Sequence, residues 1–256
     1  MLRIGPHVHD DQPLAAAEAT ESPVVQFFLG DPQGWAKPSF PGGDAAALRK
    51  SLDEAGVRAF IHAPYRINVA STNNRIRIPS RTLLGQYLAA AAEIGAEGVI
   101  VHGGGVTAGE DVAVGYDNWR KAVERTERPL PMLIENTAGG ENTMARGLAS
   151  VARLWDAAAG ENVGFCLDTC HAYASGEELA GIADRVKAIT GRIDLVHCNN
   201  SRDEFDSGRD RHAGMEQGTI DPLLLVDVIR SAGAPVICET PDPATDIRWL
   251  RSHLGQ

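Results

Sequence analysis

Residues 83–102 read Leu-Leu-Gly-Gln-Tyr-Leu-Ala-Ala-Ala-Ala-Glu-Ile-Gly-Ala-Glu-Gly-Val-Ile-Val-His. The apolar side chains in the first half of this stretch recur at helical spacing, at Leu83, Leu84, Tyr87, Leu88, Ala91 and Ala92. Gly95 ends this pattern, and Gly98–Val101 is a short apolar run of the kind found in buried strands. The stretch therefore predicts a helix followed by a strand, with the polar residue His102 directly after the strand.

The same alternation extends in both directions along the chain. Eight short apolar runs are predicted strands: Leu2–Ile4, Val24–Phe28, Arg58–Ile61, Gly98–Val101, Met132–Ile134, Val163–Leu167, Asp194–Val196 and Pro235–Cys238. Asp44 and Asp221 can cap the helices that begin after them, Gly56 can end the first of these, and Ser175 with Glu178 matches a capping box. Further helices are predicted from about Val112, Thr143 and Asp242.

Eight strand-then-helix units in 256 residues predict an α/β protein built as a (β/α)₈ barrel, or TIM barrel. Barrels of this kind form one unit of about 250 residues, so we expect a single domain over residues 1–256. A doubly wound open sheet is the alternative. It is disfavoured because the first strand-to-helix turn lacks the Gly-x-Gly-x-x-Gly pattern of dinucleotide-binding folds.

The composition is that of an ordinary folded protein, with 43% hydrophobic and 23% charged residues. The N-terminal residues have no signal-peptide pattern and no apolar run is long enough to span a membrane, so we expect a cytoplasmic protein that is not secreted. The formal net charge of −10 argues against nucleic-acid binding, unless carboxylates counted in it hold metal ions. The four cysteines are expected to be buried as small apolar residues. Nothing in the sequence demands more than a monomer.

Polar residues suited to metal binding follow six of the predicted strands. They are His62, His102, Glu135, Asp168, His197 and Glu239, with His171 just beyond Asp168. Asp210 and His212, two residues apart, lie in the segment after the seventh strand, where an extended chain would place both side chains on one side. In a barrel the carboxyl ends of all strands meet at one mouth, so we expect these nine side chains to converge there.

Such a cluster predicts a metal centre. A lone histidine after a strand is more often a packed or surface residue than a ligand, but packing does not require five histidines at or beside the predicted strand ends. Four carboxylates brought together without cations would repel one another. Imidazoles favour zinc or a similar transition metal, and nine ligands suit two or three ions. Neighbouring ions of this kind serve phosphate-ester hydrolysis, which is the reaction class we favour.

The residues around these positions also resemble a known family, endonuclease IV, the apurinic/apyrimidinic endonucleases. The resemblance rests on Ile4-Gly-Pro-His-Val, His62-Ala-Pro-Tyr, Val101-His-Gly-Gly, Leu133-Ile-Glu-Asn-Thr-Ala-Gly, Leu167-Asp-Thr-Cys-His-Ala-Tyr, Val196-His-Cys-Asn, Arg209-Asp-Arg-His and Cys238-Glu-Thr-Pro. These blocks run in order over essentially the whole chain. The resemblance implies a TIM barrel that holds three zinc ions, with manganese or iron as substitutes.

The resemblance also implies a role for each ligand. His62, His102 and Glu135 would hold one ion; Glu135, Asp168, His197 and Glu239 a second; and His171, Asp210 and His212 the third. Glu135, Glu239 and Asp168 would be catalytic, with Glu135 bridging two ions and Glu239 orienting the attacking water. The reaction would hydrolyse the phosphodiester 5′ to an abasic site in double-stranded DNA, leaving a 3′-hydroxyl and a 5′-deoxyribose phosphate. Family members also remove blocked 3′ ends during base excision repair.

The resemblance further implies that loops after the second and third strands grip DNA and flip out the abasic nucleotide. Tyr65 matches the family's stacking tyrosine, whereas Gln33 and Arg66 stand where the family has an arginine and a leucine that wedge into the duplex. His9 also departs from the family's small residues and is expected to lie at the surface or behind the ligands. Further DNA contacts are expected from Arg75, Arg209 and Arg211.

Two other functions compete with this interpretation. A metal-dependent sugar isomerase or epimerase would use a similar barrel, but such sites are rich in carboxylates and hold one or two ions. Five histidines with the Asp210-x-His212 pair argue against it. A non-catalytic binder of damaged DNA would keep the metals as structure only. The presence of both Glu135 and Glu239 argues against that alternative.

Overall fold

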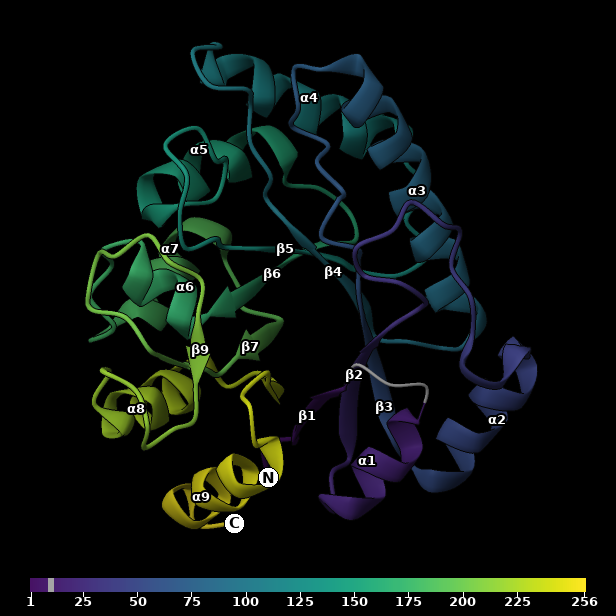
Figure 1. Ribbon diagram of the computed structural model, residues 1–256, viewed down its shortest axis with the longest axis vertical. Helices are drawn as coiled ribbons and strands as arrows, with labels where there is room; N and C mark the ends of the chain where they lie inside the picture. Colours follow the sequence, from purple (N-terminus) through teal and green to yellow (C-terminus); the bar gives the residue numbers. More distant parts are fainter. Residues whose placement is uncertain (9–11) are drawn as a thin grey trace.

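The computed structural model describes residues 1–8 and 12–256. Within them, eight parallel strands close into a barrel with helices around its outside (Figure 1). In chain order the barrel strands are β1 (Ile4–Val8), β2 (Val24–Phe28), β3 (Arg58–His62), β4 (Gly98–His102), β5 (Met132–Glu135), β6 (Val163–Asp168), β7 (Leu195–His197) and β10 (Val236–Cys238). Each strand pairs with its neighbours in sequence order, and β1 closes the ring against β10. The prediction of a (β/α)₈ barrel is therefore confirmed.

Helices connect successive strands and pack against the outer face of the barrel. They are α1 (Pro13–Ala19), α2 (Ala45–Ala55), α3 (Asn74–Glu93), α4 (Val112–Arg125), α5 (Gly147–Ala158), α7 (Ile182–Thr190), α8 (Pro222–Ala232) and α9 (Pro243–Leu254), with the short α6 (Thr169–Ala174) and a 3₁₀ turn, η1 (Pro41–Gly43). The side chains of Asp44, Asp221 and Asp242 accept hydrogen bonds from the first-turn amides of α2, α8 and α9. Gly56 ends α2 in the left-handed conformation, at φ 65°.

Some predicted boundaries are wrong, each for a local reason. Ser175 does not begin a helix but ends α6, while Glu178 precedes α7, which begins after Gly181. The Ser-x-x-Glu pattern of a capping box looks the same in the sequence whether a helix begins at the serine or ends there. The first strand runs over Ile4–Val8 instead of Leu2–Ile4, because it pairs with β10 and β2 at those residues.

The chain between β7 and α8 adds a small antiparallel pair outside the barrel, β8 (Asn200–Ser201) and β9 (His212–Ala213). This pairing folds residues 202–211 back toward the barrel mouth, where His212 Nε2 lies 3.8 Å from Asp168 Oδ2 at the end of β6. The segment between β7 and α8 carries two predicted ligands, Asp210 and His212. No helix among the described residues has the length and apolar character needed to cross a bilayer.

The barrel interior contains an apolar layer under a polar layer. The apolar layer consists of Val24, Phe60, Ile100, Leu133, Cys166, Leu195 and Ile237, all buried. Side chains alternate between the two faces of a strand, so the residue two positions further along each strand also points inward. Those residues are Gln26, His62, His102, Glu135, Asp168, His197 and Glu239. The same two-residue step on each of these strands therefore places six predicted ligands and one glutamine in a single layer at the mouth.

Candidate metal centre

Glu135, at the end of β5, is the centre of the polar layer and is fully buried. Its Oε2 lies 3.4 Å from His62 Nε2 and 3.1 Å from His102 Nε2. These three side chains form the first group of donor atoms, all within 4.8 Å of one another. The set matches the ligands predicted for one ion.

The other carboxylate oxygen of Glu135 belongs to a second group. Glu135 Oε1 lies 2.9 Å from His197 Nδ1, which is also 3.3 Å from Glu239 Oε2 and 4.0 Å from Asp168 Oδ2. Donor atoms of these four residues lie within 4.8 Å of one another. Glu135 thus faces both groups, as a carboxylate that bridges two ions would.

The third group comes from elements outside the barrel strands. His171 lies on α6 and His212 on β9, and the Nε2 atom of each is 3.1 Å from Asp210 Oδ1. Asp168 also joins this group, since its donor atoms lie within 4.8 Å of those of His171 and His212. Asp168 therefore stands between the second and third groups, a shared position that the sequence did not suggest.

The hydrogen bonds of three histidines test whether these groups suit a metal ion. The Nδ1 atoms of His62, His171 and His212 face the carbonyl oxygens of Ala63, Asn136 and Glu239, at 2.7, 2.9 and 3.3 Å. A carbonyl oxygen only accepts, so each Nδ1 carries a proton, and the ring atom that faces the cluster is Nε2.

Two of these Nε2 atoms and one oxygen of Glu135 lack hydrogen-bonding partners among the described residues. His171 Nε2, His212 Nε2 and Glu135 Oε2 are buried and make no hydrogen bond within that part of the chain, although oppositely charged or polar groups lie within 4 Å. Lone pairs that face one another in a buried space require a cation or a proton between them. The donor set of imidazole nitrogens and carboxylate oxygens therefore fits a borderline transition metal such as zinc.

The acidic and basic side chains of the cluster stabilise one another's charged forms. Burial raises the pKa of Glu135, but His197 and His102 more than offset this and hold the pKa well below its ordinary value. Burial likewise opposes ionisation of Glu239, yet His197 contributes most to lowering its pKa to about 2. Burial lowers the pKa of His212, whereas Asp210 and Asp168 raise it to about 9. The carboxylates of Glu135 and Glu239 are therefore anionic at neutral pH, and a metal ion competes with protons for the imidazole nitrogens.

Three amide side chains that were not predicted hold the ligands in place. Asn199 donates to Asp168 Oδ2 at 2.7 Å, and its Oδ1 accepts from the backbone N–H of Glu239 at 2.8 Å. Asn136 donates to the carbonyl of Asp168 at 2.9 Å. Gln26 contacts both His197 and Glu239. The Val24-x-Gln26 spacing, which repeats Phe60-x-His62, is the signal in the sequence that could have found Gln26.

All four cysteines are buried, as expected. One of them, Cys166, lies directly beneath the cluster, with its sulfur within 4.8 Å of donor atoms of Glu135 and His197. Burial raises the pKa of the Cys166 thiol to about 12, so it stays protonated at neutral pH.

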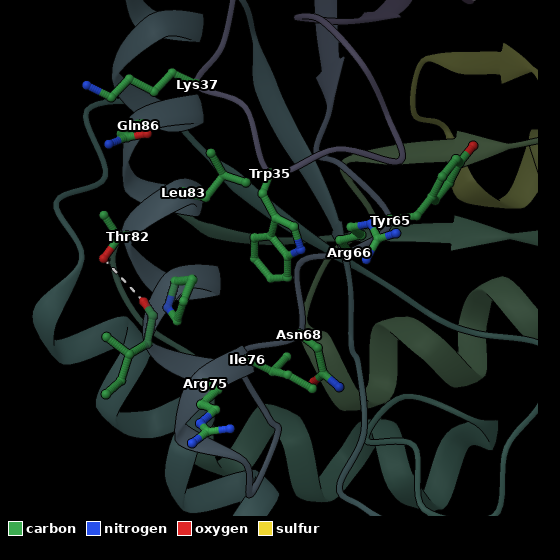
Figure 2. A pocket seen from close by; sticks show the side chains of 12 residues that line it. Trp35, Lys37, Tyr65, Arg66, Asn68, Arg75, Ile76, Thr82, Leu83 and Gln86 are labelled. Carbon is green, nitrogen blue, oxygen red and sulfur yellow. Dashed lines mark hydrogen bonds between the residues drawn. The ribbon is translucent and has the colours of Figure 1, made fainter.

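Three of the residues predicted to contact DNA, Tyr65, Arg66 and Arg75, line a cleft beside the cluster. The cleft has a volume of about 980 Å³ and lies between the loop after β2 and the first half of α3. Its lining includes Trp35, Tyr65, Arg66 and Arg75, and none of the described side chains that line it is a carboxylate (Figure 2). The Trp35 and Tyr65 side chains are 41% and 42% exposed, which leaves aromatic surface available for stacking. Arg75 lies in the first turn of α3.

The two positions that depart from the family's wedge residues are in direct contact. The Arg66 guanidinium donates to the backbone carbonyl of Gln33, and the Tyr65 amide donates to the carbonyl of Pro32 at 2.9 Å. These bonds join the loops after β2 and β3. Gln33 itself does not line the cleft. His9 lies outside the described residues.

Arg209 and Arg211 lie near the third group, but both are paired. Each guanidinium contacts the carboxylate of Asp203, at 3.2 Å for Arg209, while both side chains stay more than half exposed. The Asp203 pairing neutralises part of their charge and fixes the direction of the two guanidinium groups. They face solvent on the segment that carries Asp210.

A second, smaller cavity borders the cluster and shares part of its lining with the cleft. It has a volume of about 530 Å³, and its walls include Tyr65, His102, His171 and Asp210 together with the backbone of glycines 104, 105, 139 and 140. Tyr65 lines both spaces. Tyr65 therefore stands at the boundary between the cleft and the cavity that the metal-binding side chains line.

The fold and this layer of ligands define a class of barrel. A family model described as "Xylose isomerase-like TIM barrel" matches residues 14–254. A solved D-tagatose 3-epimerase-like protein aligns with a TM-score of 0.80 at 18% identity, covering 99% of this chain and 97% of that one. At that identity the likeness shows the fold alone. The chain is a xylose isomerase-like TIM barrel.

More similar proteins narrow the assignment. A Mycobacterium tuberculosis (strain ATCC 25177 / H37Ra) protein named "Probable endonuclease 4" is 56% identical over 256 residues, which covers 99% of this chain and 100% of the relative. The crystal structure of endonuclease IV from Thermus thermophilus aligns with a TM-score of 0.85 at 28% identity, covering 99% of each chain. The chain belongs to the endonuclease IV family, as the sequence motifs indicated.

Proposed function

We propose that this protein is a metal-dependent endonuclease that hydrolyses the phosphodiester 5′ to an abasic site in double-stranded DNA. The products would be a 3′-hydroxyl and a 5′-deoxyribose phosphate, and blocked 3′ ends would be further substrates. One observation carries the proposal: three groups of metal donors lie together at the barrel mouth. Glu135 belongs to the first and second groups, and Asp168 belongs to the second and third. The names of the relatives support the class of reaction.

Nine residues would hold three ions in this proposal. His62, His102 and Glu135 would hold the first; Glu135, Asp168, His197 and Glu239 the second; and His171, Asp210 and His212 the third, with Asp168 nearby. Zinc is the ion that five imidazoles favour, with manganese or iron as substitutes. Bound divalent ions lower the pKa of water and neutralise charge on phosphate oxygens.

The protein's own side chains would supply position and charge. Glu239, held by Gln26 and Asn199, would accept a hydrogen bond from the attacking water and orient it. The phenol of Tyr65 keeps its proton, because burial and the carboxylates of Glu239 and Glu135 raise its pKa. Its exposed ring would stack against the nucleotide that enters the smaller cavity.

DNA would lie across the cleft, where cationic and aromatic side chains surround a surface whose described lining has no carboxylate. Bound divalent ions would offset part of the formal net charge of −10 and make the mouth locally attractive to phosphate. We infer a monomer of one domain that acts on chromosomal DNA in the cytoplasm, in base excision repair.

Incision of a duplex that carries one tetrahydrofuran abasic analogue tests the proposal. The analogue cannot undergo β-elimination, so a cut must be hydrolytic. We expect one cut 5′ to the analogue, which is lost after prolonged chelation and restored by added zinc. If the zinc-loaded protein leaves the duplex intact but interconverts a ketose and its epimer, the sugar epimerase alternative is correct.

Replacement of Arg75 by alanine should weaken DNA binding through loss of one phosphate contact. We expect affinity for abasic and intact duplexes to fall together, and the slope of log affinity against log salt concentration to fall by about 0.9. Arg230→Ala is the matched control, since Arg230 lies at the C-terminal end of α8, far from the mouth. An unchanged salt slope for the Arg75 variant would exclude this contact.

A further inference from the structure

Gln26 is the member of the inward polar layer that is not itself a metal ligand. It lies on β2 and is completely buried, two residues beyond Val24 of the apolar layer. A buried amide must have its donors and acceptor satisfied, or its burial is costly. Each polar atom of the Gln26 amide contacts a polar group at the barrel mouth.

These contacts determine the orientation of the amide. Gln26 Nε2 lies 2.7 Å from Glu239 Oε1, a carboxylate oxygen that only accepts, so this atom is the amide nitrogen. The same nitrogen lies 2.8 Å from His7 Nδ1, which takes its second proton. The amide oxygen then faces His197 Nε2 at 2.8 Å, and this ring nitrogen must carry a proton.

Protonation of Nε2 determines which nitrogen of His197 is left for the second donor group. With Nε2 protonated and bound to Gln26, Nδ1 is the ring atom that faces Glu135 and Glu239, where the second donor group gathers. The remaining histidine ligands whose tautomers are defined, His62, His171 and His212, carry the proton on Nδ1 instead. His197 is therefore turned the opposite way, and its partner on the Nε2 side is a side chain and not a backbone carbonyl.

We propose that Gln26 is a positioning residue for the second donor group: it holds His197 as a ligand through Nδ1 and Glu239 in reach of the same ion. The inference rests on the proposed function, because it concerns the metal centre assigned there. Asn199 restrains Glu239 from the other side, through the Glu239 backbone N–H. Gln26 restrains the side chains of both His197 and Glu239 at once.

Gln26→Met tests the proposal, because methionine fills a similar volume and makes none of the three hydrogen bonds. Zinc content is measured after dialysis against graded concentrations of a chelator. We expect the wild-type protein to keep three ions under conditions in which the variant loses one, with an affinity for that ion about 10- to 100-fold lower. Gln26→Glu keeps an oxygen for His197 but places a carboxylate against Glu239, so it should lose the same ion.

A matched control replaces another buried amide. Asn118 is buried and donates to two backbone carbonyls, those of Ala70 and Ser71, on the outer side of the barrel. Asn118→Leu should lower thermal stability to a similar extent as Gln26→Met while keeping all three zinc ions. Two-bond ¹H–¹⁵N spectra of the histidine rings add a direct readout: we expect the His197 signals alone to lose the Nε2–H pattern in Gln26→Met.

The outcomes separate this inference from the proposed function. A wild-type protein that binds no zinc would overturn the metal centre and the role of Gln26 with it. A Gln26→Met variant that keeps three ions at the same chelator concentration as wild type would overturn the role of Gln26 alone. Loss of zinc in equal measure from Asn118→Leu would show that general destabilisation is the cause, which would also overturn it.

Discussion

Glu135→Gln is expected to remove two of the three metal sites and to reduce DNA cleavage by about 10⁴-fold or more. Both oxygens of this carboxylate are used, Oε2 toward His62 and His102 and Oε1 toward His197. Glutamine offers one oxygen, and its NH₂ group has no lone pair for a metal ion. The substitution also removes the negative charge that two neighbouring cations would share.

Zinc content and steady-state cleavage of the abasic duplex measure this effect together. We expect the variant to retain about one ion, held by His171, Asp210 and His212, and to fold normally because the side-chain volume is unchanged. Glu161→Gln is the control, since Glu161 is exposed just before β6, at the opposite end of the barrel. Full zinc content in Glu135→Gln would contradict the assignment of Glu135 as a bridge.

Glu239→Gln is expected to reduce cleavage by about 10³-fold while DNA affinity stays within about threefold of wild type. Glu239 lies at the edge of the second group and does not line the DNA cleft. Loss of its charge removes a ligand and the acceptor for the attacking water, but the Arg66 and Arg75 side chains keep their places. The neutral amide can still hydrogen-bond to Gln26, so folding is not impaired.

The Glu239 variant also separates an enzyme from a mere binder of damaged DNA. Binding is measured by anisotropy with a labelled abasic duplex, and cleavage by single-turnover kinetics on the same duplex. A binder would show little change in either measurement. Equal losses of binding and cleavage would place Glu239 in DNA recognition instead of in the chemical step.

The strand ends were predictable because patterns typical of strands and of helices alternate regularly along this sequence. Short apolar runs alternate with amphipathic helical segments, and a ligand-type residue follows six of the runs, as in Val99-Ile-Val-His102. In a parallel barrel each strand begins at one end and finishes at the other. A residue's place in the strand therefore sets its height in the barrel, and His62, His102 and Glu135 lie in one layer as expected.

The helix starts and the third donor group were harder to predict, because local sequence pattern does not determine them. Ser175 with Glu178 has the letters of a capping box, but the short helix α6 already occupies the residues before it. The approach of His171 to Asp210 depends on the pairing of β8 with β9, two residues each, which no propensity signals. Spacing could only indicate that Asp210 and His212 share a side of the chain.

By itself the sequence determined the barrel, the strand ends that carry six of the nine ligands, and the family, because these follow from residue order and periodicity along one chain. Only the tertiary structure decided which carboxylates are shared, which ring nitrogen of each histidine faces the cluster, and that Gln26 restrains His197 and Glu239. Those properties are distances and directions between side chains up to 213 positions apart. They are set by closure of the barrel, which brings β2 and the end of β10 to the same mouth.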